Sequence, residues 1–144
     1  MLFRSWIRPC YVYGPNDVNT RLIPSLIKKF SRNENVYLDE CNTTIDYLYI
    51  DDFVNFVYHL IISNDNGVYN ICSNNQYKLK NIITLIHQLT NSKSEVTFDK
   101  KLNRTTSNGF ICGDNTKIKT LSGIINITDI NNGLIKTIKF LNEL

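Results

Sequence analysis

The stretch Ile45-Asp46-Tyr47-Leu48-Tyr49-Ile50-Asp51-Asp52-Phe53-Val54 is predicted to be a strand that runs directly into a helix. In its first half, odd-numbered and even-numbered residues point to opposite sides of the strand, and aromatic and β-branched residues favour that conformation. The apolar spacing then changes to that of one helix face. The apolar positions of this helix are Phe53, Val54, Phe56, Val57, Leu60 and Ile61. A carboxylate at Asp51 or Asp52 can cap the helix by accepting N–H groups of its first turn.

The composition is that of one globular domain covering residues 1–144, with 42% hydrophobic and 20% charged residues. The net charge is +3 and no dense basic run exists, which argues against a nucleic-acid partner. No apolar run approaches the roughly 18 residues of a membrane span, and no signal peptide is recognisable. We therefore expect a cytoplasmic protein with no membrane partner.

The four cysteines lie far apart in the sequence, at Cys10, Cys41, Cys72 and Cys112, with no Cys-x-x-Cys pair. Metal ligation and a disulfide framework both normally require closer spacing or a secreted context. The sequence therefore predicts reduced, mostly buried thiols and no metal site.

Apolar periodicity and turn residues predict further strands and helices along the chain. Strands are expected at residues 1–12, 36–38, 68–72, 95–98 and 110–113, and helices at residues 21–32, 78–90, 114–123 and from residue 128 or 129 onward. The first strand is apolar on both faces, through Leu2, Phe3, Trp6 and Ile7. Because parallel strands of this kind are covered by helices and neighbouring strands, we expect part of that cover to lie outside this chain. The fold class is α/β.

Five motifs, in order, resemble the NAD(P)-dependent nucleotide-sugar epimerases and dehydratases, the extended short-chain dehydrogenases/reductases. They are Arg8-Pro9-Cys10-Tyr11-Val12-Tyr13-Gly14-Pro15, Leu22-Ile23-Pro24, Tyr47-Leu48-Tyr49-Ile50-Asp51-Asp52, Gly67-Val68-Tyr69-Asn70-Ile71 and Gly133-Leu134-Ile135-Lys136-Thr137-Ile138. The resemblance covers nearly the whole chain but only the C-terminal half of the family. It implies the last strands of a Rossmann-like, doubly wound, mostly parallel fold with a small substrate-binding α/β lobe, and an absent N-terminal dinucleotide-binding portion.

The family's chemistry is transient hydride transfer to a bound nicotinamide. It uses a Gly-rich turn for the pyrophosphate and a Tyr-x-x-x-Lys pair, in which the lysine lowers the tyrosine pKa. Neither pattern occurs in these residues. We therefore expect no catalytic residue here, no turnover by this chain alone, and no tight binding of NAD or NADP, the cofactor of the complete enzyme.

The resemblance also implies positions for ligand contacts. Pro9 and Cys10 match residues that line the nicotinamide, although they could simply end a strand. Leu22-Ile23-Pro24 matches a segment near the nucleotide base, and Tyr37 and Leu38 match a strand that walls the base. For these residues, plain core packing is the alternative.

Two positions depart from the family pattern. Tyr11 stands where many members have an Asn that contacts the sugar-nucleotide phosphates, and Ile45 stands where many have an Arg that grips the diphosphate. Arg104, in a polar loop, is the candidate replacement, because a guanidinium fork suits two phosphate oxygens. The alternative for Arg104 is a solvated surface side chain.

The leading hypothesis is the substrate-binding portion of a sugar-nucleotide epimerase, dehydratase or reductase. Its partners would be a nucleotide-diphosphate sugar and the missing Rossmann half. The alternative is a non-catalytic, stand-alone nucleotide-sugar-binding or interaction protein derived from the same fold. The sugar, the base, the reaction subtype and the choice of NAD or NADP stay open.

Overall fold

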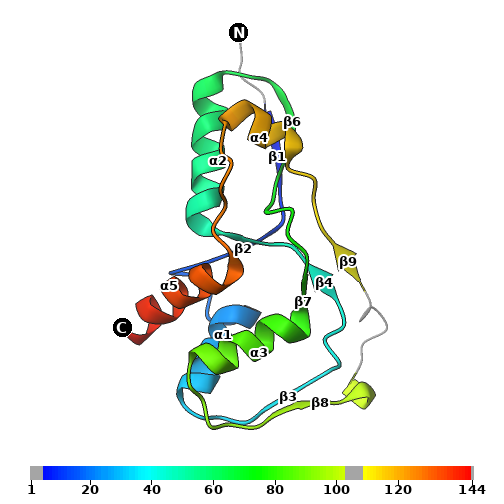
Figure 1. The fold of residues 1–144 in the computed structure, drawn as a ribbon, viewed down its shortest axis with the longest axis vertical. Helices are drawn as coiled ribbons and strands as arrows, with labels where there is room; N and C mark the ends of the chain where they lie inside the picture. Colours follow the sequence, from blue (N-terminus) through cyan, green and yellow to red (C-terminus); the bar gives the residue numbers. More distant parts are fainter. Residues whose placement is uncertain (1–4, 103–108, 144) are drawn as a thin grey trace.

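The computed structural model describes residues 5–102 and 109–143 and has an α/β architecture with parallel strand pairs (Figure 1). The strands are β1 (Ser5–Pro9), β2 (Tyr11–Tyr13), β3 (Val36–Leu38), β4 (Thr44–Ile45), β5 (Tyr47–Tyr49), β6 (Gly67–Ile71), β7 (Tyr77–Lys78), β8 (Val96–Phe98) and β9 (Phe110–Ile111). The helices are α1 (Leu22–Ser31), α2 (Ile50–Ser63), α3 (Leu79–Leu89), α4 (Thr116–Ser122) and α5 (Ile130–Asn142), and a 3-10 turn covers Lys100–Leu102.

The segment formed by β4, β5 and the start of α2 lies between two hydrophobic cores. Ile45, Tyr47 and Tyr49 belong to one core, whereas Leu48, on the opposite side of β5, belongs to the other. The alternation predicted from the sequence is therefore confirmed. All four side chains are buried, so this segment is covered on both sides.

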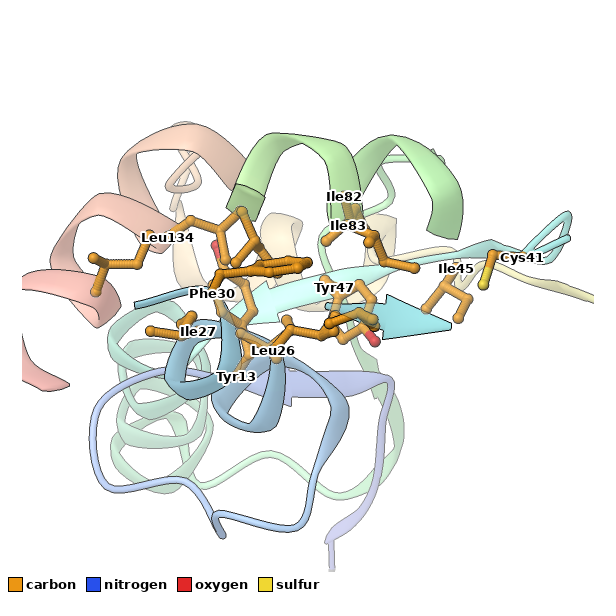
Figure 2. Packing of buried hydrophobic residues seen from close by; sticks show 14 of the residues in the cluster. Tyr13, Leu26, Ile27, Phe30, Cys41, Ile45, Tyr47, Ile82, Ile83 and Leu134 are labelled. Carbon is orange, nitrogen blue, oxygen red and sulfur yellow. The ribbon is translucent and has the colours of Figure 1, made fainter. Parts of the chain in front are cut away.

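The first core belongs to what we call the three-helix region: α1, α3 and α5 together with β3 and β8. These helices turn their apolar faces toward one another, and Phe30, Ile83 and Leu134 are each 0% exposed at the centre. Figure 2 shows Phe30 between Leu134 on one side and Ile82 and Ile83 on the other. The parallel pair β3–β8, from Val36↔Val96 to Leu38↔Phe98, lies at the end of this region in Figure 1.

The second core belongs to the β1–β6 region: β1 and β6 together with α2 and α4. The two strands pair in parallel, from Ser5↔Gly67 to Pro9↔Ile71. Phe56 of α2 and Ile118 of α4 are 0% exposed against the inner side of β6. On the other side of the strands, the register partners Trp6 and Val68 are exposed in the described part of the chain. Ile7 on β1, and Val54, Tyr58, Ile61 and Ile62 on α2, are further exposed apolar residues of this region.

The expectation of one strand over residues 1–12 is wrong in its extent. The chain changes partners at Cys10: β1 pairs with β6, whereas β2 pairs in parallel with β5, with Tyr11 opposite Tyr47. Because of this change of partner, the chain passes from the core of the β1–β6 region to that of the three-helix region, and one apolar run forms strands in two different pairs. Residues 1–4 lie outside the described residues, and the predictions for Leu2 and Phe3 lie there with them.

The expectation that Asp51 or Asp52 caps α2 is also wrong. The helix begins earlier, with Tyr49 at the N-cap, so both carboxylates fall in the first turn, where they favour the helix dipole. Asp52 is 8% exposed, and its Oδ2 accepts a hydrogen bond from the Thr128 N–H at 2.9 Å. Asp52 therefore holds α2 against the segment that precedes α5.

Candidate functional site

Two adjoining cavities lie where β1 and β2 lead into the loop before α1. The larger has a volume of about 450 Å³ and is lined by Pro9, Cys10 and Tyr11 together with the loop through Asp17 and the start of α2. The smaller, of about 200 Å³, is lined by Tyr11, the Leu22–Ile23 start of α1, and Tyr47. Both cavities share Tyr11, Asp17 and Arg21. Five of the residues predicted for ligand contacts, Pro9, Cys10, Tyr11, Leu22 and Ile23, therefore line these two adjoining cavities.

Tyr11 and Tyr47 form the wall between strand and cavity. Tyr11 is 46% exposed, and its ring centroid lies 5.6 Å from that of Tyr47, which β2–β5 pairing places directly opposite. Burial raises the pKa of Tyr47 to about 12, with the neighbouring Tyr11 and Asp17 adding to the effect. Burial also raises the pKa of Tyr13 well above its ordinary range. The Tyr47 and Tyr13 phenols stay protonated at neutral pH, so they can donate hydrogen bonds but cannot act as bases.

Arg21 is the cationic side chain that lines both cavities. It directly precedes α1, and its Nη1 lies 3.4 Å from Oδ1 of Asp17. The arginine is 63% exposed and Asp17 only 13%, so the guanidinium reaches outward from a carboxylate that is largely covered. A guanidinium in this place can contact an anionic group in the hollow. Arg21 was not among the residues predicted for ligand contacts, because its single signal in the sequence is its position next to the Leu22-Ile23-Pro24 motif.

Other predicted residues do not line these cavities. Pro24 is buried in the first turn of α1, and Leu38 packs against the three-helix core. Tyr37, on β3, is 66% exposed and lies with that strand in the three-helix region (Figure 1). Ile45 is buried in the three-helix core, as its apolar side chain requires. Arg104 lies outside the described residues.

A further hollow of about 490 Å³ lies between α1 and the end of α5. Its lining is largely polar and includes Lys28, Ser31 and Arg32 from α1 and Asn142 from α5. It contains none of the residues predicted for ligand contacts. The cavities beside β2 are therefore the better candidate site.

Residues 2–72 match the NAD dependent epimerase/dehydratase family. The CDP-abequose synthase of Salmonella muenchen is 29% identical over 91 residues, which are 61% of this chain and 31% of that protein. No helix in the described part of the chain is both long and apolar enough to cross a bilayer.

Several solved structures share the fold of this chain over nearly its whole length. UDP-glucose 4-epimerase from Thermotoga maritima, solved with UDP-glucose, has a TM-score of 0.86 at 22% identity and matches 96% of this chain and 46% of its own. RMD from Pseudomonas aeruginosa, solved with NADPH, has a TM-score of 0.83 at 18% identity and matches 97% and 48%. The chain thus spans about half the length of these structures. Residues 2–72 are thus similar in sequence to the NAD-dependent epimerase/dehydratase family, and nearly the whole chain shares the fold of these solved structures.

Proposed function

We propose that residues 1–144 are the substrate-binding portion of an NAD(P)-dependent sugar-nucleotide epimerase, dehydratase or reductase. The observation that carries this proposal is the hollow beside β2, which gathers Pro9, Cys10, Tyr11 and the Leu22–Ile23 segment around one cation, Arg21. A nucleoside diphosphate combines a base, which can stack on aromatic rings, with an anion that Arg21 can pair. The names of the relatives, which carry CDP and UDP, agree with a ligand of that kind.

The nicotinamide cofactor fits this chain only in part. Pro9 and Cys10, with the apolar side chains of Val12, Ile50 and Phe53, offer a neutral surface suited to the nicotinamide ring. The sequence contains no Gly-rich turn to hold the pyrophosphate. A bound dinucleotide would supply the hydride-accepting ring. This chain would contribute a wall that excludes water and orients the sugar, and the dinucleotide-binding portion would be made by residues outside these 144.

Calorimetry with UDP and CDP tests the phosphate assignment, with uridine and cytidine as phosphate-free controls. Arg21→Ala should weaken binding of the diphosphates by roughly tenfold or more, the scale of a hydrogen bond to a charged group, and leave the nucleosides unaffected. Arg32→Ala is the matched control, because Arg32 is a surface arginine at the other end of the same helix, paired only with Glu34 in the described residues. Equal affinity in wild type and Arg21→Ala would remove Arg21 from the site.

The same measurement on Arg104→Ala decides whether that residue grips the diphosphate, as the family resemblance implies. We expect a loss of similar size, about 1.5–3 kcal/mol. NADH fluorescence on the chain alone should show negligible affinity and no nucleotide sugar should be turned over. Micromolar NADH binding would contradict the proposal that the dinucleotide portion lies elsewhere.

A further inference from the structure

Two cysteines lie side by side at the carboxyl ends of β1 and β6. The register that pairs Pro9 with Ile71 makes Cys10 and Cys72 the next residues of neighbouring parallel strands, and the Cys10 N–H donates to the Ile71 carbonyl at 3.1 Å. Cys72 is 0% exposed, whereas Cys10 is half-buried. Sixty-one residues separate these thiols in the chain, so the sequence alone gave no sign that they meet.

A buried carboxylate completes a three-residue cluster. Asp46, in the link between β4 and β5, is 0% exposed, and its ligand oxygen and the sulfurs of Cys10 and Cys72 all lie within 4.8 Å of one another. Its Oδ1 accepts from the Ser73 N–H at 2.9 Å and from the Ser73 hydroxyl at 2.6 Å, and its Oδ2 accepts from the Asn74 N–H at 2.8 Å. These donors fix the direction of the carboxylate.

The carboxylate has no positive partner among the described side chains, where the ion pairs involve other residues. A fully buried charge is normally paired with an opposite charge or bound to a metal ion. These neutral donors leave the charge of Asp46 uncompensated. Beyond the Asn74 N–H, Oδ2 has only long contacts, with the Gly113 N–H at 3.4 Å and the Cys112 sulfur at 3.7 Å, and these can give way to a cation. A cation held beside Asp46 would compensate it.

A third thiol borders the cluster. Cys112 follows β9, and its Sγ lies 3.7 Å from Oδ2 of Asp46. The next residue, Gly113, leaves room for the sulfurs, because a Cβ there would lie 2.6 Å from Sγ of Cys72 and 3.1 Å from Sγ of Cys10. The segments after β1, β6 and β9 thus place three thiols around Asp46, with the Cys112 sulfur in contact with the carboxylate but outside the 4.8 Å group of Cys10, Cys72 and Asp46.

We propose that Cys10, Cys72, Cys112 and Asp46 bind a thiophilic divalent cation of the Zn²⁺ class. Three thiolates and one carboxylate oxygen make a four-ligand set of the kind that favours tetrahedral zinc. In such a site Zn–S bonds of about 2.3 Å put neighbouring sulfurs roughly 3.8 Å apart. Cys10, Cys72 and Asp46 therefore need only a small inward movement, whereas the Cys112 side chain has to turn from Asp46 toward the two other sulfurs. Ser73 and Asn74 would orient the carboxylate ligand.

A disulfide between Cys10 and Cys72 is the competing outcome. Burial, followed by the negative charge of Asp46, raises the pKa of the Cys10 thiol, and burial also raises that of Cys72. Since the thiolate is the reactive species, oxidation should be slow at neutral pH. A bound cation instead removes the thiol protons, so cation affinity should rise with pH. The ion would sit at the wall of the 450 Å³ cavity that Cys10 lines.

Titration of the reduced 144-residue chain with Co²⁺, as a spectroscopic substitute for Zn²⁺, tests the site. We expect thiolate-to-cobalt charge-transfer and intense d–d bands that saturate at one equivalent and disappear when Zn²⁺ is added. Cys10→Ser and Cys112→Ser should each weaken Co²⁺ binding at least tenfold, as ~10–100-fold losses are usual even for outer partners of metal ligands. Cys41→Ser is the matched control, since that thiol lies apart in the three-helix core beside Asp39.

The proposal is overturned if no charge-transfer band forms, if the band survives in Cys10→Ser, or if Cys41→Ser abolishes it equally. Circular dichroism checks that each variant is folded, and the half-buried Cys10 and Cys112 decide the matter should Cys72→Ser not fold. X-ray absorption of the zinc-loaded wild-type chain gives a second readout, with sulfur neighbours expected at about 2.3 Å. A shell of nitrogen and oxygen alone would contradict the site. No nucleotide enters these measurements, so they stand apart from the proposed function.

Discussion

The three-helix region and the β1–β6 region use their apolar side chains in different ways. In the first, the apolar faces of α1, α3 and α5 meet one another, and Phe30 and Leu134 are completely buried. In the second, β6 is covered by α2 and α4 on one side, while Trp6 is 70% exposed and Ile61 of α2 is 60% exposed. One region buries its apolar faces within this chain, whereas the other leaves apolar side chains exposed among the described residues. Apolar faces of that kind normally mark an interface.

The substitution with the largest expected effect lies in the three-helix region. Phe30→Ala should lower the free energy of unfolding by about 3–5 kcal/mol, because it opens a cavity among helices that cannot collapse together without losing other contacts. Ile61→Ala is the matched comparison: an apolar residue on a helix face that nothing in the described part of the chain covers. Its cost should stay within about 0.5 kcal/mol. Urea unfolding followed by far-UV circular dichroism measures both.

If the two variants lost similar amounts of unfolding free energy, the two regions would not differ in how their apolar side chains are covered. A cost near zero for Phe30→Ala would mean that the three-helix core is loosely packed, and a cost of several kcal/mol for Ile61→Ala would mean that the open face of α2 is covered.

The sequence predicted the type of most elements and the opposite sides taken by alternate residues from Ile45 to Tyr49, because side-chain periodicity reports directly on burial. It misplaced the ends of elements, because a helix start depends on backbone geometry: α1 covers Leu22–Ser31, not residues 21–32, and α2 begins after Tyr49, not after Asp51 or Asp52. The division of the first strand at Cys10 depends on which strands lie alongside, and no local pattern encodes that choice.

The candidate site was predictable only where its residues are contiguous. Pro9, Cys10 and Tyr11 fall together because they are consecutive, and Leu22 and Ile23 join them across one loop. Tyr37 and Leu38 lie on β3 and line neither cavity, a separation that spacing along the chain cannot show. The cluster of Cys10, Cys72 and Asp46 was missed for the converse reason, since parallel pairing joins residues that are distant in sequence.

A smaller effect concerns the acid sensitivity of the three-helix region. Asp129 is the N-cap of α5, and its Oδ1 accepts from the Asn132 N–H at 3.1 Å. This hydrogen bond lowers the pKa of the Asp129 carboxyl below its ordinary value of 3.8. Asp129→Ala should cost about 1 kcal/mol at neutral pH.

The pH dependence follows from the sign of that shift. A carboxyl whose pKa is lower in the folded state stabilises the fold above its unfolded pKa, and the contribution is lost as the pH falls through the folded value. The difference between wild type and Asp129→Ala should therefore shrink as the pH falls below about 4. Because the side chain is exposed, solvent screens the effect and the change is gradual. A constant difference across about pH 2–7, measured by thermal unfolding, would show that the hydrogen bonds of the cap do not depend on the charge of Asp129.

Substitutions of Trp6 and Ile61 are expected to have the smallest effect on stability. They test whether the exposed apolar side chains of the β1–β6 region form an interface. Since both side chains face solvent in the described structure, Trp6→Ser and Ile61→Ser should each change the free energy of unfolding by no more than about 0.5 kcal/mol. Their effect should instead be on association: sedimentation equilibrium should show self-association of the wild-type chain that the double variant reduces.

Trp6 is the one tryptophan in the sequence, so its fluorescence reports on β1 directly. We expect red-shifted emission that acrylamide quenches readily, and a blue shift when a dinucleotide-binding portion docks. A strictly monomeric wild type with cooperative unfolding and a shielded Trp6 would mean that the β1–β6 region is closed without a partner, and would favour a stand-alone nucleotide-sugar-binding protein over a portion of a larger enzyme.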